Sequence, residues 1–398
     1  MNQIKQFYRK MYKQIAFYWV WFKRWRKSKH IKVNPRKIVF LTINNMYTCN
    51  PKYIAEELLK RNLDYELVWM TTKKVIVDNH FFPKGITLRF INTPEAFIDI
   101  MSAKVIIDNG FKYQEGHYLP KLPGQIYIET WHGSLGLKRF GAKYDSVKTR
   151  VKAAKRCGKL TDFCISNSDF ETNLVYHGEF WPTASVWKVG HPRNDILINA
   201  NSNEQKELKQ KICEIYQIDE KKKIALYAPT FRDDMSEGYY QIELYLLQQT
   251  LKRRFSGEWH IMIRYHFISR NLAVTIQEND YVTNVTNYTD MQELLAITDV
   301  GITDYSSWIC DFVLTKKPAF LFATDISAYE NERGFYYPLK TTPFPLATSN
   351  DELMENILNF DEKSYVEKCD NFIAEKGCEE NGSAAFETVN KIIQLMEQ

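Results

Sequence analysis

The sequence lacks the residue patterns that define several common classes of protein. Its seven cysteines are scattered, without a Cys-x-x-Cys pair, a Cys/His spacing typical of zinc sites or a dense disulfide framework. It has no GxGxxG after the first predicted strand, no GxxxxGKS/T, and no HExxH, GxSxG or protein-kinase signature. No apolar run approaches the ~20 residues that a membrane-spanning helix needs. These absences exclude the familiar phosphate loops and nucleophile elbows, and a reducing, cytoplasmic setting is the default expectation.

Acidic residues are missing from the N-terminal end of the chain. The 398 residues carry a net charge of +5, from 53 Lys and Arg against 48 Asp and Glu. Residues 1–37 hold twelve of the basic residues and no acid, and the first acid is Glu56. The remainder has 41 basic and 48 acidic residues, a net charge of −7. An acidic body without any nucleic-acid-binding motif argues against DNA or RNA as a partner.

The basic N-terminal end also carries many aromatic residues. Its one strongly apolar stretch runs from Ile15 to Phe22, and no small-residue cleavage site follows, which argues against a signal peptide. Apolar and aromatic residues recur here near helical spacing, with Lys and Arg between them. The pattern predicts a basic amphipathic helix over residues 1–30 that lies on an anionic membrane surface. The alternative is a helix docked on its own domain with a solvated basic flank.

The rest of the chain alternates between strand and helix patterns, which is typical of a doubly wound α/β sheet. The expected strands are 37–43, 65–70, 86–91, 104–108, 125–129, 163–166, 186–189, 223–228, 259–264, 281–285, 300–303 and 318–322. The expected helices include 51–61, 93–101, 169–176, 240–252, 291–297, 306–314, 350–359 and 384–396. The polar stretch 199–211 divides the series and predicts two Rossmann-like domains, 31–202 and 203–398. Such domains face one another across a cleft at the carboxyl ends of their strands.

Two segments of the first predicted domain place polar side chains at the ends of strands. Residues 130–138 (TWHGSLGLK) put His132 beside Gly133, where an imidazole could act as a general base near neutral pH. A loop histidine bonded to backbone is an equally good interpretation. Residues 190–195 (GHPRND) resemble a helix start near the domain boundary, which favours Arg193 as a structural ion-pair partner.

Two further segments lie at strand ends of the second predicted domain. Arg232 in the segment APTFRD, together with Arg264 and His266 in RYHF, offers two guanidinium groups and an imidazole, a set that suits a pyrophosphate. The segment VGITDYSSWICDF runs from a strand into Ser306 and Ser307 at the start of an apolar helix. Free backbone N–H groups and hydroxyls there predict a phosphate cradle. Alternatively, Asp304 or Ser306 merely caps the helix.

Taken together, these segments resemble the CDP-glycerol glycerophosphotransferase family, the alditol-phosphate transferases of bacterial teichoic acid and capsule assembly. The resemblance runs from about residue 37 to 385 and is specific, because several motifs occur in the family's order and spacing. These motifs are WHGSLGLKRFG at 131–141, GHPRNDIL at 190–197, APTFRD at 228–233, RYHF at 264–267, TDYSSWICDF at 303–312, KKPAFLF at 316–322 and ERGFY at 332–336.

The resemblance implies a GT-B-like architecture and a membrane-contacting N-terminus, with an N-terminal acceptor domain and a C-terminal domain that binds a CDP-alditol. His132 would take the proton of the acceptor hydroxyl, and His266 would join it as the second catalytic residue. The CDP pyrophosphate would be held by His266, Arg264, Arg232, Ser306 and Ser307. The other residues expected at the substrates are Gly133, Arg193, Pro229, Thr230, Asp304 and Asp311.

The implied reaction transfers glycerol phosphate from CDP-glycerol to a hydroxyl of a lipid-linked or polymeric acceptor and releases CMP. It would take place at the cytoplasmic face of the plasma membrane, on an anionic surface. No metal site or other cofactor is predicted, and a metal requirement does not follow from the sequence.

Three departures from the family pattern leave the alditol open. The first motif has Gly-Ser-Leu-Gly-Leu-Lys where the family usually has Gly-Thr-Pro-Leu-Lys, His191 replaces the usual tyrosine, and Phe267 replaces a common proline. Ribitol or another alditol could therefore replace glycerol. Two functions of other classes remain as alternatives: a glycosyltransferase that uses a nucleotide sugar on the same fold, and a non-catalytic nucleotide-binding scaffold on the membrane surface.

Overall fold

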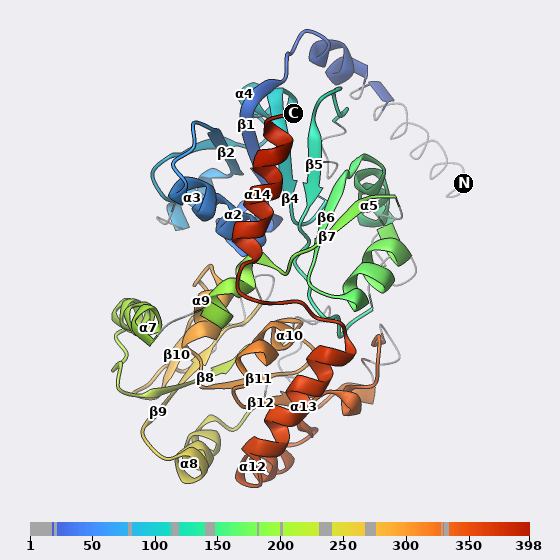
Figure 1. Ribbon diagram of the computed structural model, residues 1–398. Helices are drawn as coiled ribbons and strands as arrows, with labels where there is room; N and C mark the ends of the chain where they lie inside the picture. Colours follow the sequence, from blue (N-terminus) through green and yellow to red (C-terminus); the bar gives the residue numbers. More distant parts are fainter. Residues whose placement is uncertain are drawn as a thin grey trace, which may run out of the picture.

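Parallel β-sheets form the centre of each half of the protein (Figure 1). The computed structural model describes residues 18–19, 22–78, 82–111, 113, 119–139, 148–180, 183–199, 202–230, 241–266, 276–327, 329 and 334–398. Within these residues the order of the first sheet is β3-β2-β1-β4-β5-β6-β7, and that of the second is β10-β9-β8-β11-β12-β13. The predicted α/β fold with two facing domains is confirmed.

The strands lie close to their predicted positions. The first sheet consists of β1 (Asn34–Leu41), β2 (Glu66–Thr71), β3 (Ile86–Phe90), β4 (Ala103–Asp108), β5 (Ile126–Glu129), β6 (Phe163–Ser166) and β7 (Ser185–Lys188). The second consists of β8 (Lys223–Tyr227), β9 (Trp259–Ile263), β10 (Val282–Asn284), β11 (Val300–Thr303), β12 (Ala319–Phe322) and β13 (Leu346–Ala347). Strand β13 has two residues and was not predicted.

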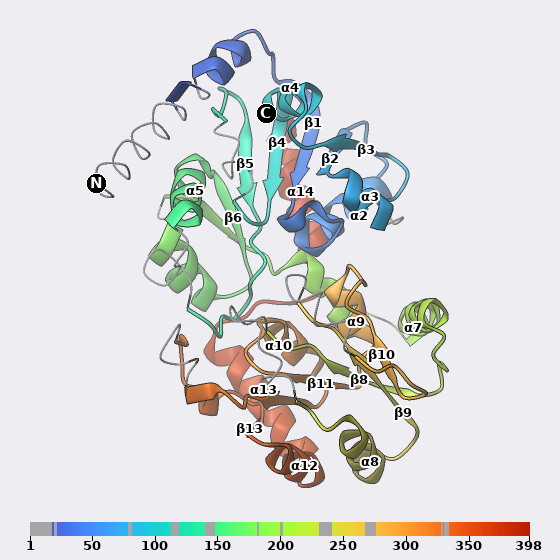
Figure 2. The ribbon, with the colours of Figure 1, turned by 180° about the vertical axis from the view of Figure 1, so that it is seen from behind.

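Helices cover both faces of each sheet, which is why the strands are apolar on both sides (Figures 1 and 2). Along β1, Ile38 and Phe40 join one core cluster while Val39 and Leu41 join another. Helix α6 (Asp195–Asn199) packs its Leu197 into the core cluster of the second half. The helices of the first half are α2 (Cys49–Lys60), α3 (Lys73–Asp78), α4 (Pro94–Ser102), α5 (Lys148–Leu160), a π-helix (Glu171–Phe180) and α14 (Ala384–Met396). Those of the second are α7 (Ser202–Tyr216), α8 (Leu244–Phe255), α9 (Met291–Ile297), α10 (Trp308–Phe312), α12 (Asn350–Leu358) and α13 (Glu362–Glu375).

The last helix corrects the predicted division of the chain into residues 31–202 and 203–398. Helix α14 follows α13 of the second domain but lies on the first sheet, as Figure 1 shows. Its residues Val389, Ile392 and Met396 belong to the core cluster that also contains Ile38 and Phe40 of β1. The chain therefore returns to the first domain near residue 380. A sequence read in order cannot reveal this return, because an amphipathic helix does not specify which sheet it covers.

The predicted N-terminal amphipathic helix lies mostly outside the described residues. Residues 18–19 and 22–28 are helical, and within them Tyr18, Trp19 and Phe22 are exposed. None of the described helices is long and apolar enough to cross a membrane.

Candidate active site

A cavity of about 250 Å³ lies between the two domains, at the carboxyl ends of strands from both sheets. In the first sheet the chain order reverses between β1 and β4, and Ile43 and Asn109, which follow these strands, line the cavity. In the second sheet the order reverses between β8 and β11, and Pro229 and Ser306 line the cavity after them. Open parallel sheets bind ligands at such reversals. The cavity therefore lies at the reversal point of both sheets.

His132 projects from the loop after β5 and lines this cavity. Its Nδ1 lies 2.7 Å from the backbone oxygen of Asn109, at the end of β4. A carbonyl oxygen only accepts hydrogen bonds, so Nδ1 carries the proton and the lone pair of the neutral ring is on Nε2. The indole of Trp131 packs on the ring, with centroids 4.2 Å apart. The imidazole is held in the tautomer that a general base needs.

The backbone that leads to His132 is held by buried polar groups. Trp131 has a φ of +51°, a strained value for a bulky residue, and its N–H donates to Glu129 Oε1 over 3.0 Å. Asn50 at the start of α2 donates through Nδ2 to the carbonyl oxygens of Thr130, at 2.9 Å, and Trp131, at 3.2 Å. Burial and the Asp108 carboxylate raise the pKa of Glu129 well above its ordinary value. The turn is thus fixed by hydrogen bonds from both of its sides.

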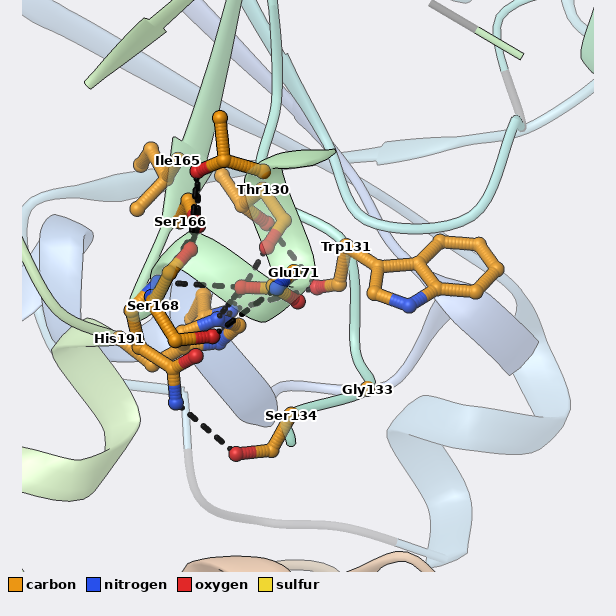
Figure 3. Close-up of polar contacts among 12 residues, drawn as sticks. Thr130, Trp131, Gly133, Ser134, Ile165, Ser166, Ser168, Glu171 and His191 are labelled. Carbon is orange, nitrogen blue, oxygen red and sulfur yellow. Dashed lines mark hydrogen bonds and ion pairs between the residues drawn. The ribbon is translucent and has the colours of Figure 1, made fainter. Parts of the chain in front are cut away.

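Figure 3 shows the buried cluster behind this loop, with Trp131 pointing away from it. His191 accepts from Asn50 at Nδ1 over 3.2 Å and donates from Nε2 to Glu171 Oε2 over 2.7 Å. Both His191 and Glu171 are fully buried. Asn50 contacts His191 as well as the two carbonyl oxygens before His132. The segment GHPRND therefore helps to hold the segment TWHGSLGLK in place.

The loop continues from His132 into the second domain. Leu135 and Leu137 are fully buried in the core cluster of that domain. The Tyr336 N–H donates to the oxygen of Leu137 over 2.9 Å, and the Tyr337 hydroxyl donates to the oxygen of Leu135 over 2.9 Å. Two motifs that lie 200 residues apart in the sequence, WHGSLGLK and ERGFY, therefore join the two sides of the cavity.

Arg193 has the structural role that its position near the domain boundary favours. It is 3% exposed, and its Nε and Nη2 donate to the two oxygens of Asp311 over 3.1 and 3.2 Å. Its Nη2 also donates to the Gly133 oxygen, one residue after His132. Asn194 and Gln292 complete the donors to Asp311. Arg193 and Asp311 line the cavity, but their charges are committed to one another.

The opposite wall of the cavity is cationic and hydroxylic. Arg264 and His266 follow β9, and Ser306 and Ser307 follow β11. Arg264 donates to the backbone oxygen of Tyr288 over 3.2 Å. Desolvation, followed by the positive charges of Lys138 and Arg264, lowers the pKa of His266 to about 4. This wall concentrates positive charge and hydroxyl groups in a way that suits phosphate oxygens.

The start of α10 separates the two interpretations of the Ser-Ser pair. The helix begins at Trp308, two residues later than predicted, and Ser307 is its N-cap without a side-chain cap hydrogen bond. Asp304 caps nothing in α10 and accepts instead from the Thr230 N–H at 2.7 Å and from the Tyr305 N–H. It thereby ties the loop after β11 to the loop after β8. The N-cap of α10 is therefore neither Asp304 nor Ser306, and both serines line the cavity.

The structure brings most of the predicted site residues together. Those that line the cavity are His132, Arg193, Pro229, Arg264, His266, Ser306, Ser307 and Asp311. Gly133, Thr230 and Asp304 support the lining from behind through their hydrogen bonds. Arg232 lies outside the described residues. Among the described residues there is no group of three or more His, Cys, Asp or Glu side chains that could hold a metal ion.

Sequence reasoning missed Asn109, Asn50 and an ion pair that joins the two domains. Lys52 of α2 contacts Asp290 at 2.5 Å and Glu293 at 2.6 Å across the domain boundary. Asn109 comes directly after the predicted strand 104–108, in the polar sequence Asp-Asn-Gly. It therefore shows the same signal as His132, a polar side chain at the end of a strand. Asn50 gave no signal, because its partners, the carbonyl oxygens of Thr130 and Trp131 and the His191 ring, are brought to it only by the fold.

Two facing α/β domains, with a fixed histidine on one wall and an arginine and two hydroxyl groups on the other, define a GT-B-like transferase of nucleotide-activated groups. The family model for CDP-glycerol:poly(glycerophosphate) glycerophosphotransferases matches residues 23–394, and the chain belongs to this family.

Relatives of known activity agree with this assignment. A teichoic acid poly(glycerol phosphate) polymerase of Bacillus spizizenii is 30% identical over 85% of this chain and 90% of its own length. Another from Staphylococcus epidermidis is 31% identical over 90% of this chain, which spans 50% of that protein. A teichoic acid glycerol-phosphate transferase of Staphylococcus aureus is 29% identical over 81% of this chain and 83% of its own length.

Solved structures show the same architecture. The wall teichoic acid polymerase TagF, in a variant soaked with CDPG, superposes with a TM-score of 0.81 at 27% identity, over all of this chain and 98% of that chain. The UDP-GlcNAc 2-epimerase of Methanocaldococcus jannaschii has a TM-score of 0.51 at 11% identity, over 90% of this chain and 99% of its own, and shares the fold alone.

Proposed function

We propose that this protein transfers glycerol phosphate, or a closely related alditol phosphate, from its CDP derivative to a hydroxyl of a membrane-associated teichoic acid or capsule acceptor, with release of CMP. The observation that carries the proposal is the hydrogen bond from His132 Nδ1 to the Asn109 oxygen, because it leaves a basic Nε2 in a cavity whose other wall is cationic. Family membership and relatives that handle glycerol phosphate support the choice of donor.

In the proposed reaction His132 Nε2 takes the proton of the acceptor hydroxyl. The acceptor oxygen forms a bond to the β-phosphorus of CDP-glycerol, and the bond from that phosphorus to the oxygen bridging to CMP breaks. CMP leaves with the bonding electrons. A positioned base of this kind contributes ~10²–10⁴-fold to the rate.

Arg264, His266, Ser306 and Ser307 would bind the pyrophosphate on the other wall. The Arg264 guanidinium and the two hydroxyls donate hydrogen bonds to phosphate oxygens, and Arg264 offsets the charge that develops on CMP. His266 is neutral at pH 7 without ligand, since its pKa is about 4, and proximity to the anionic pyrophosphate would raise that pKa toward its ordinary value. Arg193 then acts as a positioning residue that donates to the Gly133 carbonyl oxygen, and Asp311 holds Arg193 in place.

The acceptor would be reached from the cytoplasmic face of the plasma membrane, with the protein bound peripherally. This part rests on the net charge of +12 over residues 1–37 and on the exposed Tyr18, Trp19 and Phe22.

A donor panel tests the proposal. The protein is incubated with a lipid-linked glycerol phosphate acceptor and with CDP-glycerol, CDP-ribitol or UDP-GlcNAc, and the free nucleotide and the acceptor mass are measured. We expect CMP release and one added alditol phosphate with a CDP-alditol. Turnover of the UDP-sugar alone would instead identify a glycosyltransferase. Absence of CDP-glycerol binding by calorimetry would identify a non-catalytic scaffold.

A further inference from the structure

A second cavity, of about 300 Å³, lies between the helical turns at residues 22–28 and the first sheet. Its inner walls are apolar and come from the end of β1 and from α4, and Leu41, Ala96 and Ile100 in these walls are each less than 5% exposed. The size is at the lower end of that of small-molecule sites. The donor and acceptor chemistry described above does not use this cavity.

Three basic side chains, Lys23, Arg24 and Lys27, line the side of this cavity that the N-terminal helix provides. Lys23 Nζ lies 3.5 Å from the centre of the Trp19 ring, and Lys27 Nζ lies 5.5 Å from that of Phe97. Among the described residues, no ion pair joins Lys23 or Lys27 to a carboxylate. Cations that face aromatic rings beside an apolar cavity complement a ligand with an anionic head and a hydrocarbon body.

We propose that this cavity binds one hydrocarbon chain of an anionic membrane phospholipid, with its phosphate at Lys23 and Lys27. Trp19 and Phe22, 58% and 47% exposed on the same helix, would enter the interfacial region of the bilayer beside it. The inference rests on the membrane part of the proposed function and deepens it. In this proposal the N-terminal segment binds an individual phospholipid molecule in addition to being attracted to a charged membrane surface.

The position of the cavity gives this lipid a role. Leu41 of β1 lines the lipid cavity, and Ile43, two residues further along, lines the cavity that contains His132. Two residues span at most about 7 Å of chain. A phospholipid seated against Leu41 would therefore hold this part of the wall of the catalytic cavity close to the membrane surface that carries the acceptor.

Soluble alkyl phosphates test the proposal without a membrane. Calorimetry measures the binding of butyl, hexyl, octyl and decyl phosphate below their critical micelle concentrations, with inorganic phosphate as the headgroup alone. Each methylene that leaves water should tighten binding about fourfold until the cavity is filled. Equal affinities for butyl and decyl phosphate would overturn the proposal.

Two double variants remove the same charge from the same segment. Lys23→Gln with Lys27→Gln changes cations that line the cavity, whereas Lys29→Gln with Lys32→Gln changes cations outside it. We expect the first pair to weaken decyl phosphate binding at least about tenfold and the second pair to have little effect at 0.15 M salt. Equal losses would show attraction by net charge only and contradict a specific site.

A third variant, Ala96→Trp, fills the cavity without changing charge. It should abolish the dependence on chain length and reduce sedimentation with phosphatidylglycerol vesicles; unchanged values would contradict the proposal. CMP release with a water-soluble acceptor should be the same in wild type and in the Lys23/Lys27 variant. A wild type that releases no CMP would refute the proposed function, whereas loss of alkyl phosphate binding alone would refute only the lipid site.

Discussion

The two walls of the catalytic cavity are built differently. On the first wall, His132 stands on a loop whose backbone is fixed by Asn50, Glu129 and Arg193, and its own Nδ1 is bound to a carbonyl oxygen. On the second wall, Arg264, His266 and the two serines bring charge and hydroxyl groups to the ends of two strands. The first wall therefore fixes the position of the His132 ring, and the second wall supplies the positive charge and the hydroxyl groups. Changes to the first should lower kcat, and changes to the second should weaken donor binding.

Replacement of Arg264 with Gln should produce the largest effect on donor affinity. A charged hydrogen bond contributes about 1.5–3 kcal/mol, so the Kd for CDP-glycerol should rise roughly 10–150-fold in calorimetry. Arg253→Gln, an exposed arginine on α8, is the matched control. If Arg264→Gln binds CDP-glycerol as tightly as the control does, the second wall does not hold the pyrophosphate.

Removal of the Asn50 side chain should lower kcat about tenfold without changing the Kd for CDP-glycerol. Asn50→Ala deletes the donor to the carbonyl oxygens of Thr130 and Trp131, so the His132 loop loosens, and the protein loses about 1–3 kcal/mol of stability. Asn50→Asp keeps the acceptor for the Arg193 N–H but not the donor. A wild-type kcat in Asn50→Asp would show that these hydrogen bonds do not position His132.

Acid should strengthen donor binding a few-fold through His266. Its pKa is about 4 in the free protein, below the ordinary 6.5, and an adjacent pyrophosphate would raise it. Binding is then coupled to proton uptake, so the Kd for CDP-glycerol should fall as pH drops from 8 to 6. His266→Gln should abolish this slope, and calorimetry in two buffers of different ionisation heat measures the proton uptake. If the Kd of the wild type for CDP-glycerol does not change with pH, His266 does not lie beside the bound pyrophosphate.

The sequence was sufficient for the strands other than β13 and for the polar strand ends, because both are local; helices α5, α7 and α13 were not among the expected elements. Lys37-Ile-Val-Phe-Leu is apolar at every position after the lysine, as a strand buried on two faces must be, and it forms β1. His132, Arg264 and Ser306 all line the cavity because parallel strands bring their carboxyl ends to one edge of each sheet.

Contacts between residues far apart in the sequence could not be predicted in this way. Asn50 reaches two carbonyls 80 residues away, and α14 returns to a sheet that begins 350 residues earlier. The residue types involved allow these contacts but do not select them. Arg193 pairs with Asp311, as an arginine beside a helix start at a domain boundary commonly pairs with a carboxylate, although both residues were also expected at the substrates.

The most direct test of the account is a single-turnover experiment on His132→Ala, with His177→Gln, an exposed histidine of the π-helix, as the control. CDP-glycerol is bound first, a lipid-linked acceptor is added, and CMP release is followed in time. The account predicts that His132→Ala binds CDP-glycerol as tightly as wild type and releases CMP ~10²–10⁴-fold more slowly. CMP release at the wild-type rate would contradict the assignment of His132 as the general base.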